Sequence, residues 1–71
     1  MIQPEVIENW FTYHAPSKDD LVAYEKLRSS AKDFAKVINE YCPDSADKTA
    51  AIRKLREATM TANASIACKG K

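Results

Sequence analysis

The sequence predicts an all-α fold, in which a short N-terminal helix precedes a long antiparallel helical hairpin. The 71 residues contain a single glycine, Gly70, and it lies in the tail. The only three prolines, Pro4, Pro16 and Pro43, are spaced so that they separate helices instead of interrupting them. Between them, apolar residues recur at alternating steps of three and four, the spacing of a helix that packs along another helix.

The first segment, residues 1–16, is expected to hold a short helix and an aromatic loop. Pro4 suits the first turn of a helix, where its missing N–H group is not needed. The apolar side of this helix is Val6, Ile7, Trp10 and Phe11. Trp10 and Phe11 are expected to close the open end of the hairpin, and residues 13–16 form the loop.

The second helix is expected from about Lys18 to Tyr41. Ser17 is placed to cap its N-terminus, and the carboxylates of Asp19 and Asp20 fall in the positive first turn. Pro43 ends it. The predicted inward stripe comprises Tyr24, Leu27, Ala31, Phe34, Ile38 and Tyr41.

The third helix is expected from about Ala46 to Ala67, with Asp44 or Ser45 as its cap. The tight Pro-Asp-Ser turn before it predicts an antiparallel hairpin of segments 17–42 and 45–68, followed by the tail 69–71. All 71 residues then form one domain. The predicted inward stripe comprises Ile52, Leu55, Thr59, Ala62 and Ile66.

So small a chain needs a stabiliser beyond its own core, because short domains bury a small fraction of their surface. The hairpin would place Cys42 and Cys68 on the order of 35–40 Å apart, whereas a disulfide needs Cα atoms within about 7 Å. A zinc site needs four clustered ligands, which the spacing does not offer. The small residues of the third helix occupy more than one face, which favours burial between protomers of a homo-oligomer. High alanine helix propensity is the simpler alternative.

Several function classes are disfavoured. No signal segment follows Met1, and no apolar run approaches the roughly 20 residues that span a bilayer, so we expect a cytosolic protein without a membrane partner. A net charge of +1 disfavours duplex DNA or RNA as a partner. No nucleophile–base pair, metal cluster or phosphate loop is recognisable. The chain is therefore expected not to be an enzyme and to need no cofactor or metal.

Two groups of side chains could bind a ligand. Tyr13 and His14 lie in the loop, where a planar ring could stack on a base or could pack the loop against the hairpin. Lys26 and Arg28 on the second helix are either ligand contacts or ordinary surface charges.

The other group lies on one face of the third helix. Arg56, Thr59 and Asn63 follow one another at steps of three and four, and they offer a guanidinium, a hydroxyl and an amide. Such groups bind phosphate and base edges. The alternative is an ordinary solvated face.

Together these residues resemble a known family. The segments that carry the resemblance are WFTYHAP at 10–16, YEKLR at 24–28, AKDFA at 31–35, CPDS at 42–45, AIRKLREA at 51–58 and MTANASIA at 60–67. They are similar to the hairpin domain of phage anti-CBASS sponge proteins over about residues 9–67.

The resemblance implies a homohexamer that binds cyclic dinucleotides, and cyclic trinucleotides at separate sites, without cleaving them. Such a protein would act in the cytoplasm of the infected bacterium. Tyr13 would stack on the dinucleotide, His14 would belong to the same site, and Lys26 or Arg28 would supply its basic contact. The trinucleotide candidates are Arg56, Thr59 and Asn63.

Two alternatives remain. The chain could be a phage inhibitor that lays a helical face on a host protein. A helix-turn-helix DNA binder is disfavoured by the near-neutral charge and by the length of the helices.

Overall fold

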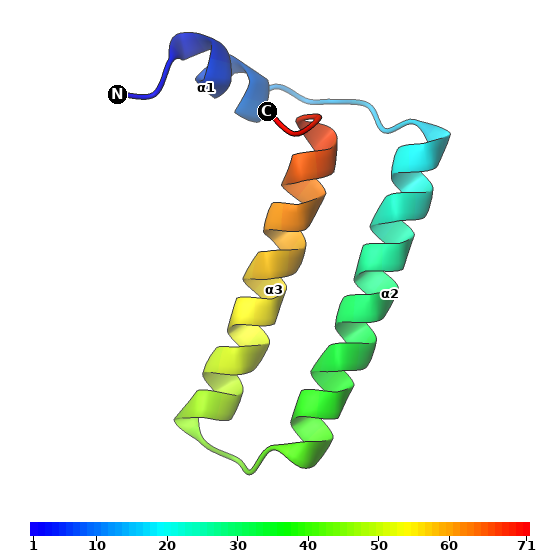
Figure 1. The fold of residues 1–71 in the computed structure, drawn as a ribbon, viewed down its shortest axis with the longest axis vertical. Helices are drawn as coiled ribbons and strands as arrows, with labels where there is room; N and C mark the ends of the chain where they lie inside the picture. Colours follow the sequence, from blue (N-terminus) through cyan, green and yellow to red (C-terminus); the bar gives the residue numbers. More distant parts are fainter.

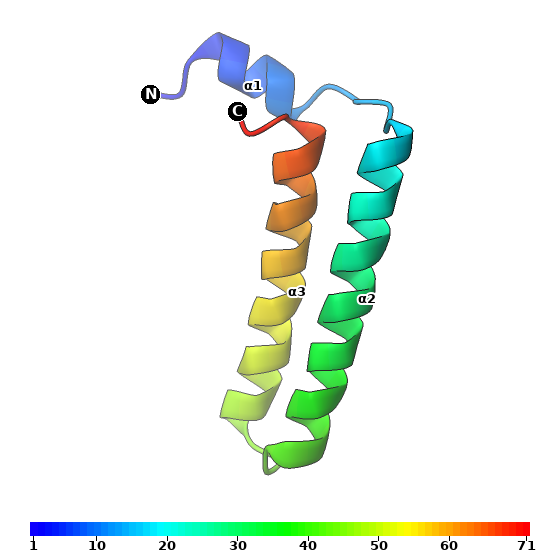
Figure 2. The same ribbon diagram turned by 45° about the vertical axis from the view of Figure 1, so that its right-hand side comes forward.

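The computed structural model describes residues 1–71 and contains three helices and no strand. Helix α1 spans Pro4–Trp10, α2 spans Lys18–Tyr41 and α3 spans Ala46–Ala67. Helices α2 and α3 run antiparallel side by side, α1 lies beside the C-terminal end of α3 and extends away from α2, and the loop between α1 and α2 crosses the open end (Figures 1 and 2). The all-α hairpin and the predicted ends of its two long helices are confirmed.

A reciprocal pair of hydrogen bonds fixes the start of α2. The backbone N–H of Asp20 donates to Ser17 Oγ at 3.1 Å, and the backbone N–H of Ser17 donates to Asp20 Oδ2 at 3.0 Å. This confirms Ser17 as the cap and adds Asp20 as the second member of a capping box. The bond from the Ser17 N–H group lowers the pKa of Asp20, because it stabilises the charged carboxylate.

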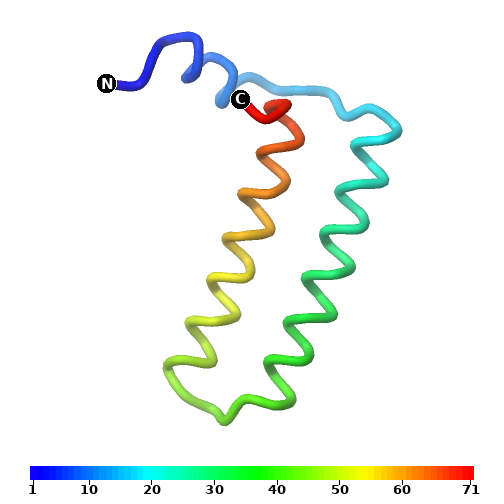
Figure 3. Tube along the Cα trace, viewed as in Figure 1, coloured from blue at the N-terminus to red at the C-terminus, as the bar shows by residue number.

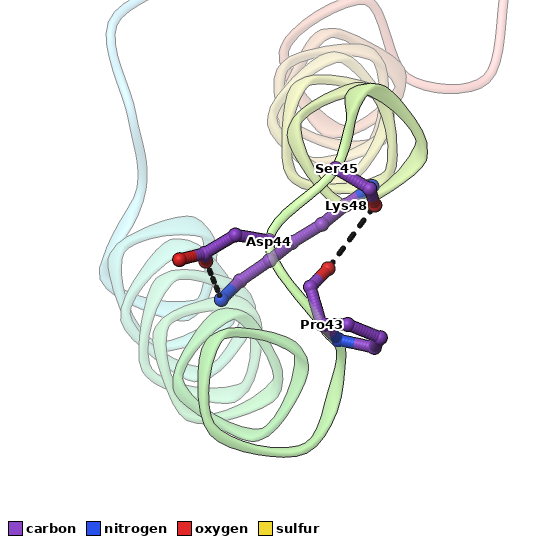
Figure 4. Close-up of polar contacts among 4 residues, drawn as sticks. All are labelled: Pro43, Asp44, Ser45 and Lys48. Carbon is purple, nitrogen blue, oxygen red and sulfur yellow. Dashed lines mark hydrogen bonds and ion pairs between the residues drawn. The ribbon is translucent and has the colours of Figure 1, made fainter.

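Four residues hold the turn between α2 and α3 (Figure 4). Ser45, not Asp44, caps α3: its Oγ accepts from the backbone N–H of Lys48 at 3.1 Å and donates to the Pro43 carbonyl at 3.1 Å. Lys48 Nζ donates to Asp44 Oδ1 at 2.8 Å and thereby lowers the pKa of Asp44. The Lys48 side chain is only 11% exposed, so its stem packs on the hairpin while its ammonium reaches Asp44.

The hairpin has almost no interior. The molecule measures 44 × 34 × 14 Å, so it is a single layer little thicker than one helix of about 10–12 Å. Ile38 is the one buried residue. The predicted stripe of α3 is confirmed as the side that faces α2, but its residues are only half-buried: Ile52, Leu55, Thr59, Ala62 and Ile66.

The predicted stripe of α2 is wrong at two positions. Phe34 is 56% exposed and Tyr41 is 77% exposed, whereas Ala35 is half-buried. The reason is helical geometry: Ala35 lies about 40° around the helix from Ala31, while Phe34 lies about 60° to the other side. The contact surface between two helices is narrow, so it includes Ala35, which lies at the smaller angle from Ala31, and leaves Phe34 outside.

The open end also differs from expectation. Trp10 is half-exposed and does contact the end of the hairpin, since its Nε1 donates to the Lys71 carbonyl at 3.4 Å. Phe11 does not close the hairpin: it follows the last residue of α1 and is exposed. Within one chain, Phe11 therefore has nothing to pack against.

Cys42 follows α2 at the turn and Cys68 follows α3 at the open end, so the two cysteines lie at opposite ends of the hairpin. The trace in Figure 3 shows the turn at one end of the molecule and the C-terminus near the other. Both are free; Cys42 is exposed and Cys68 is half-buried. This confirms that no internal bridge joins them. No helix is long and apolar enough to cross a membrane.

The turn generates a stability prediction. Ser45→Ala removes the cap of α3 and the bond to the Pro43 carbonyl, and should lower the free energy of unfolding by about 1 kcal/mol. Ser29→Ala, at an exposed position inside α2 away from Phe34, Val37 and Tyr41, is the matched control and should be neutral or slightly stabilising. Equal urea midpoints for the two variants would contradict this role of Ser45.

The capping carboxylates generate a pH prediction. Asp20 and Asp44 have folded pKa values below the ordinary 3.8, so their contribution is present above about pH 4 and is lost as pH falls through the folded values. Melting temperatures should be flat from about pH 7 to 5 and fall below about pH 4. Circular dichroism melts at constant ionic strength test this. The double variant Asp20→Asn, Asp44→Asn should decline less; an identical decline would assign the acid sensitivity to other groups.

Candidate ligand-binding surfaces

Helix α1 is tied to the far end of α3 by side-chain to backbone bonds. Asn9 Nδ2 donates to the Cys68 carbonyl at 3.4 Å, and Cys68 Sγ lies 3.9 Å from the Asn9 carbonyl as a weak donor. The Trp10 bond to Lys71 adds a third contact. These contacts fix where the aromatic loop leaves α1.

The two aromatic candidates of the loop have different environments. His14 is half-buried, and its Nε2 lies 2.7 Å from the Asn9 carbonyl, to which it donates. His14 therefore anchors the loop to the end of α1. Tyr13 is 83% exposed and makes no hydrogen bond, so its ring is not packed against the hairpin. Of the two, Tyr13 is the side chain whose faces are open to a planar ligand.

A shallow groove of about 450 Å³ runs between α2 and α3. Its cationic side chains are Arg28 and Lys32 from α2 and Arg56 from α3. No carboxylate lines the groove. The apolar part of the lining is Ala31, Ala35, Ile52, Leu55 and Met60, together with Thr59.

The structure thus regroups the predicted basic residues. Arg28 shares the groove with Arg56 and Thr59. Lys26 lies instead in a shallow depression on the outer side of α2, beside Leu21 and Val22. Two residues of separation turn a helix by about 200°, so Lys26 and Arg28 cannot serve the same surface.

The three groove cations differ in their partners. Arg28 Nη1 forms an ion pair with Glu25 Oε2 at 2.7 Å, one turn earlier on α2, and both side chains are about 70% exposed. Lys32 and Arg56 have no carboxylate within 4.0 Å. Their charges are therefore the ones most available to an anion. Lys32 was not selected as a candidate from the sequence, although its position four residues after Arg28 puts both side chains on one face of α2.

Thr59 and Asn63 have distinct hydrogen-bonding capacities. Thr59 Oγ1 donates to the Leu55 carbonyl at 2.8 Å, so only its lone pairs remain for a ligand. Asn63 does not line the groove, and its Oδ1 is buried without a donor. A buried acceptor left unpaired costs about 1–3 kcal/mol. Because this oxygen is covered by the chain itself, it is closed to a ligand in this conformation.

The two candidate surfaces are well separated within one chain. The loop of Tyr13 and His14 spans the open end (Figure 1), whereas Arg56 lies about three turns, or roughly 16 Å, before the end of α3. No group of three or more His, Cys, Asp or Glu residues is close enough to hold a metal ion. A single hairpin therefore presents an aromatic surface and a cationic groove as separate features.

Comparison with known proteins identifies the family. The family model described as Acb2/Tad1, hairpin domain matches residues 3–67, which include α1, the aromatic loop, both long helices and the groove. No curated protein and no solved structure matches the chain. The match confirms the resemblance to the anti-CBASS family, and an anti-defence role fits it. The chain belongs to the Acb2/Tad1 hairpin-domain family.

Proposed function

We propose that the chain forms a homo-oligomer, a hexamer by family resemblance, that sequesters cyclic di- and trinucleotide second messengers without cleaving them. In the cytoplasm of an infected bacterium this would keep CBASS effectors inactive. The observation that carries the proposal is the family match, because it spans both the aromatic loop and the cationic groove.

Self-association is supported by the apolar surface that the single chain leaves in water. Helical periodicity puts Phe34, Val37 and Tyr41 on the side of α2 away from Arg28 and Lys32, and all three are exposed. On α3 the same side carries Ala51 and, further toward the C-terminus, Ala58. Bulky side chains beside these small ones form a surface on which a second copy can pack closely.

Assembly also supplies what each ligand surface lacks. An exposed Tyr13 ring offers one stacking face, and a two-base ligand would use the same residue from two chains. The shallow groove between α2 and α3 likewise covers only one side of a ligand. Sites shared between chains would explain why neither surface encloses a ligand alone.

The proposal includes release of the ligand intact. His14, the one imidazole, donates from Nε2 to the Asn9 carbonyl, and the half-buried Cys68 Sγ contacts the same carbonyl, so both groups hold the end of α1. The remaining candidates, Tyr13, Arg56 and Thr59, bind or stack and do not form an acid–base pair. The binding energy then stabilises the bound ligand and does not stabilise a transition state for its cleavage.

One other function has a specific observation in its favour. The exposed Phe34, Val37 and Tyr41 would also suit docking on a host protein. Calorimetric titration with a panel of cyclic di- and trinucleotides separates the two functions. The sponge proposal predicts saturable binding of at least one class, whereas no heat with any of them would favour the docking inhibitor.

Reciprocal variants test the assignment of the two surfaces. Tyr13→Ala should weaken cyclic dinucleotide binding by about 5- to 150-fold, from roughly 1–3 kcal/mol per stacked base, and should leave trinucleotide binding unchanged. Arg56→Ala should show the reverse pattern. Both titrations follow a check of oligomer size. Equal loss of both ligands in both variants would mean a single shared site.

The fate of the ligand is tested by recovery. Cyclic nucleotide bound to the protein overnight and released by denaturation should elute unchanged from a reversed-phase column. Ligand incubated without protein is the control. A linearised product that appears only with protein would reveal an active site and contradict sequestration.

A further inference from the structure

We propose that Arg28, Lys32 and Arg56 form one phosphate-binding groove within a single hairpin, and that Lys32 is a phosphate contact of the cyclic trinucleotide site. The inference rests on the proposed function and assigns Arg28 to this site instead of to the surface of Tyr13. It concerns residues from two helices of the same chain, brought together by the hairpin.

The shape of the groove follows from two alanines. Ala31 and Ala35 lie one turn apart on α2, and neither has a side chain beyond Cβ, so the surface recedes between the cations of α2 and the facing residues of α3. Its volume of about 450 Å³ is within the range of roughly 300–1,000 Å³ typical of small-molecule sites. The groove is open, which suits a ligand that spans more than one protomer.

The charge of the groove points to an anion. Three cations line it and no carboxylate does, so its empty state places like charges around one small space. Lys32 and Arg56 have no ion-pair partner, while Glu25 holds Arg28 from outside the groove. A phosphodiester would relieve this repulsion and accept charge-assisted hydrogen bonds from all three side chains.

The remaining lining suits the base of a nucleotide. Met60, exposed beside Arg56, supplies a polarizable surface for an aromatic ring. Thr59 already donates to the Leu55 carbonyl, so it can accept from an exocyclic amino group but has no proton for a phosphate. Phosphate binding is thereby left to the three cations.

Matched lysine variants test the proposal. Lys32→Gln removes one positive charge from the groove. Lys36→Gln removes a positive charge one turn further along α2, at a residue that does not line the groove. Both positions are exposed, so both variants should keep the helical circular dichroism and oligomer size of the wild type. Lys32→Arg preserves the charge and controls for side-chain loss. The probes are cyclic tri-AMP and the linear trinucleotide pApApA, titrated at two salt concentrations.

Cyclic tri-AMP should bind Lys32→Gln about tenfold more weakly and with a smaller salt dependence, whereas Lys36→Gln and Lys32→Arg should stay within about twofold of the wild type. Wild-type affinity in Lys32→Gln would overturn the groove and leave the sponge proposal standing. Binding of pApApA alone, weakened by Lys32→Gln, would support the groove and count against capture of cyclic signals. Binding of neither probe to the wild type would overturn the groove and the trinucleotide part of the sponge proposal, while its dinucleotide part would stand or fall on titration with cyclic dinucleotides.

Discussion

The thinness of the hairpin is the constraint on which the rest of the structure depends. Two helices side by side have one seam and no second layer, so every other side of each helix faces water. Ile38 alone is buried, and Phe34, Val37 and Tyr41 stay exposed. Apolar burial is the main favourable term in folding. A layer this thin gains too little of it unless another copy covers the exposed side.

Hydrogen bonds between residues close in sequence stabilise the helix ends and the turn before the hairpin assembles. Ser17 and Ser45 cap the two long helices, and Lys48 bridges the turn to Asp44. These bonds involve residues three or four apart, so they form without a core. The exposed apolar side then remains available for a neighbour, while the cationic groove on the other side remains available for a ligand. The hairpin thereby carries the surface for self-association and the surface for phosphate binding on opposite sides.

The helix ends could be predicted from the sequence because they depend on neighbours: a capping serine, a proline, a short polar turn. The positions of Phe34 and Tyr41 could not, since large apolar residues at helical spacing signal burial without saying whether the partner is the same chain or another. The separation of Lys26 from Arg28 was already implied by helical geometry. The groove itself was not, because it depends on how α2 and α3 align, which places Lys32 opposite Arg56.

The central claim is that this chain completes its core by self-association. Sedimentation velocity across a dilution series from tens of micromolar to submicromolar tests it most directly, with melting temperatures recorded at each concentration. The account predicts particles that are multiples of the 8.0 kDa chain and a melting temperature that falls on dilution. A monomer of 8.0 kDa at every concentration, unfolding cooperatively at a constant temperature, would contradict it.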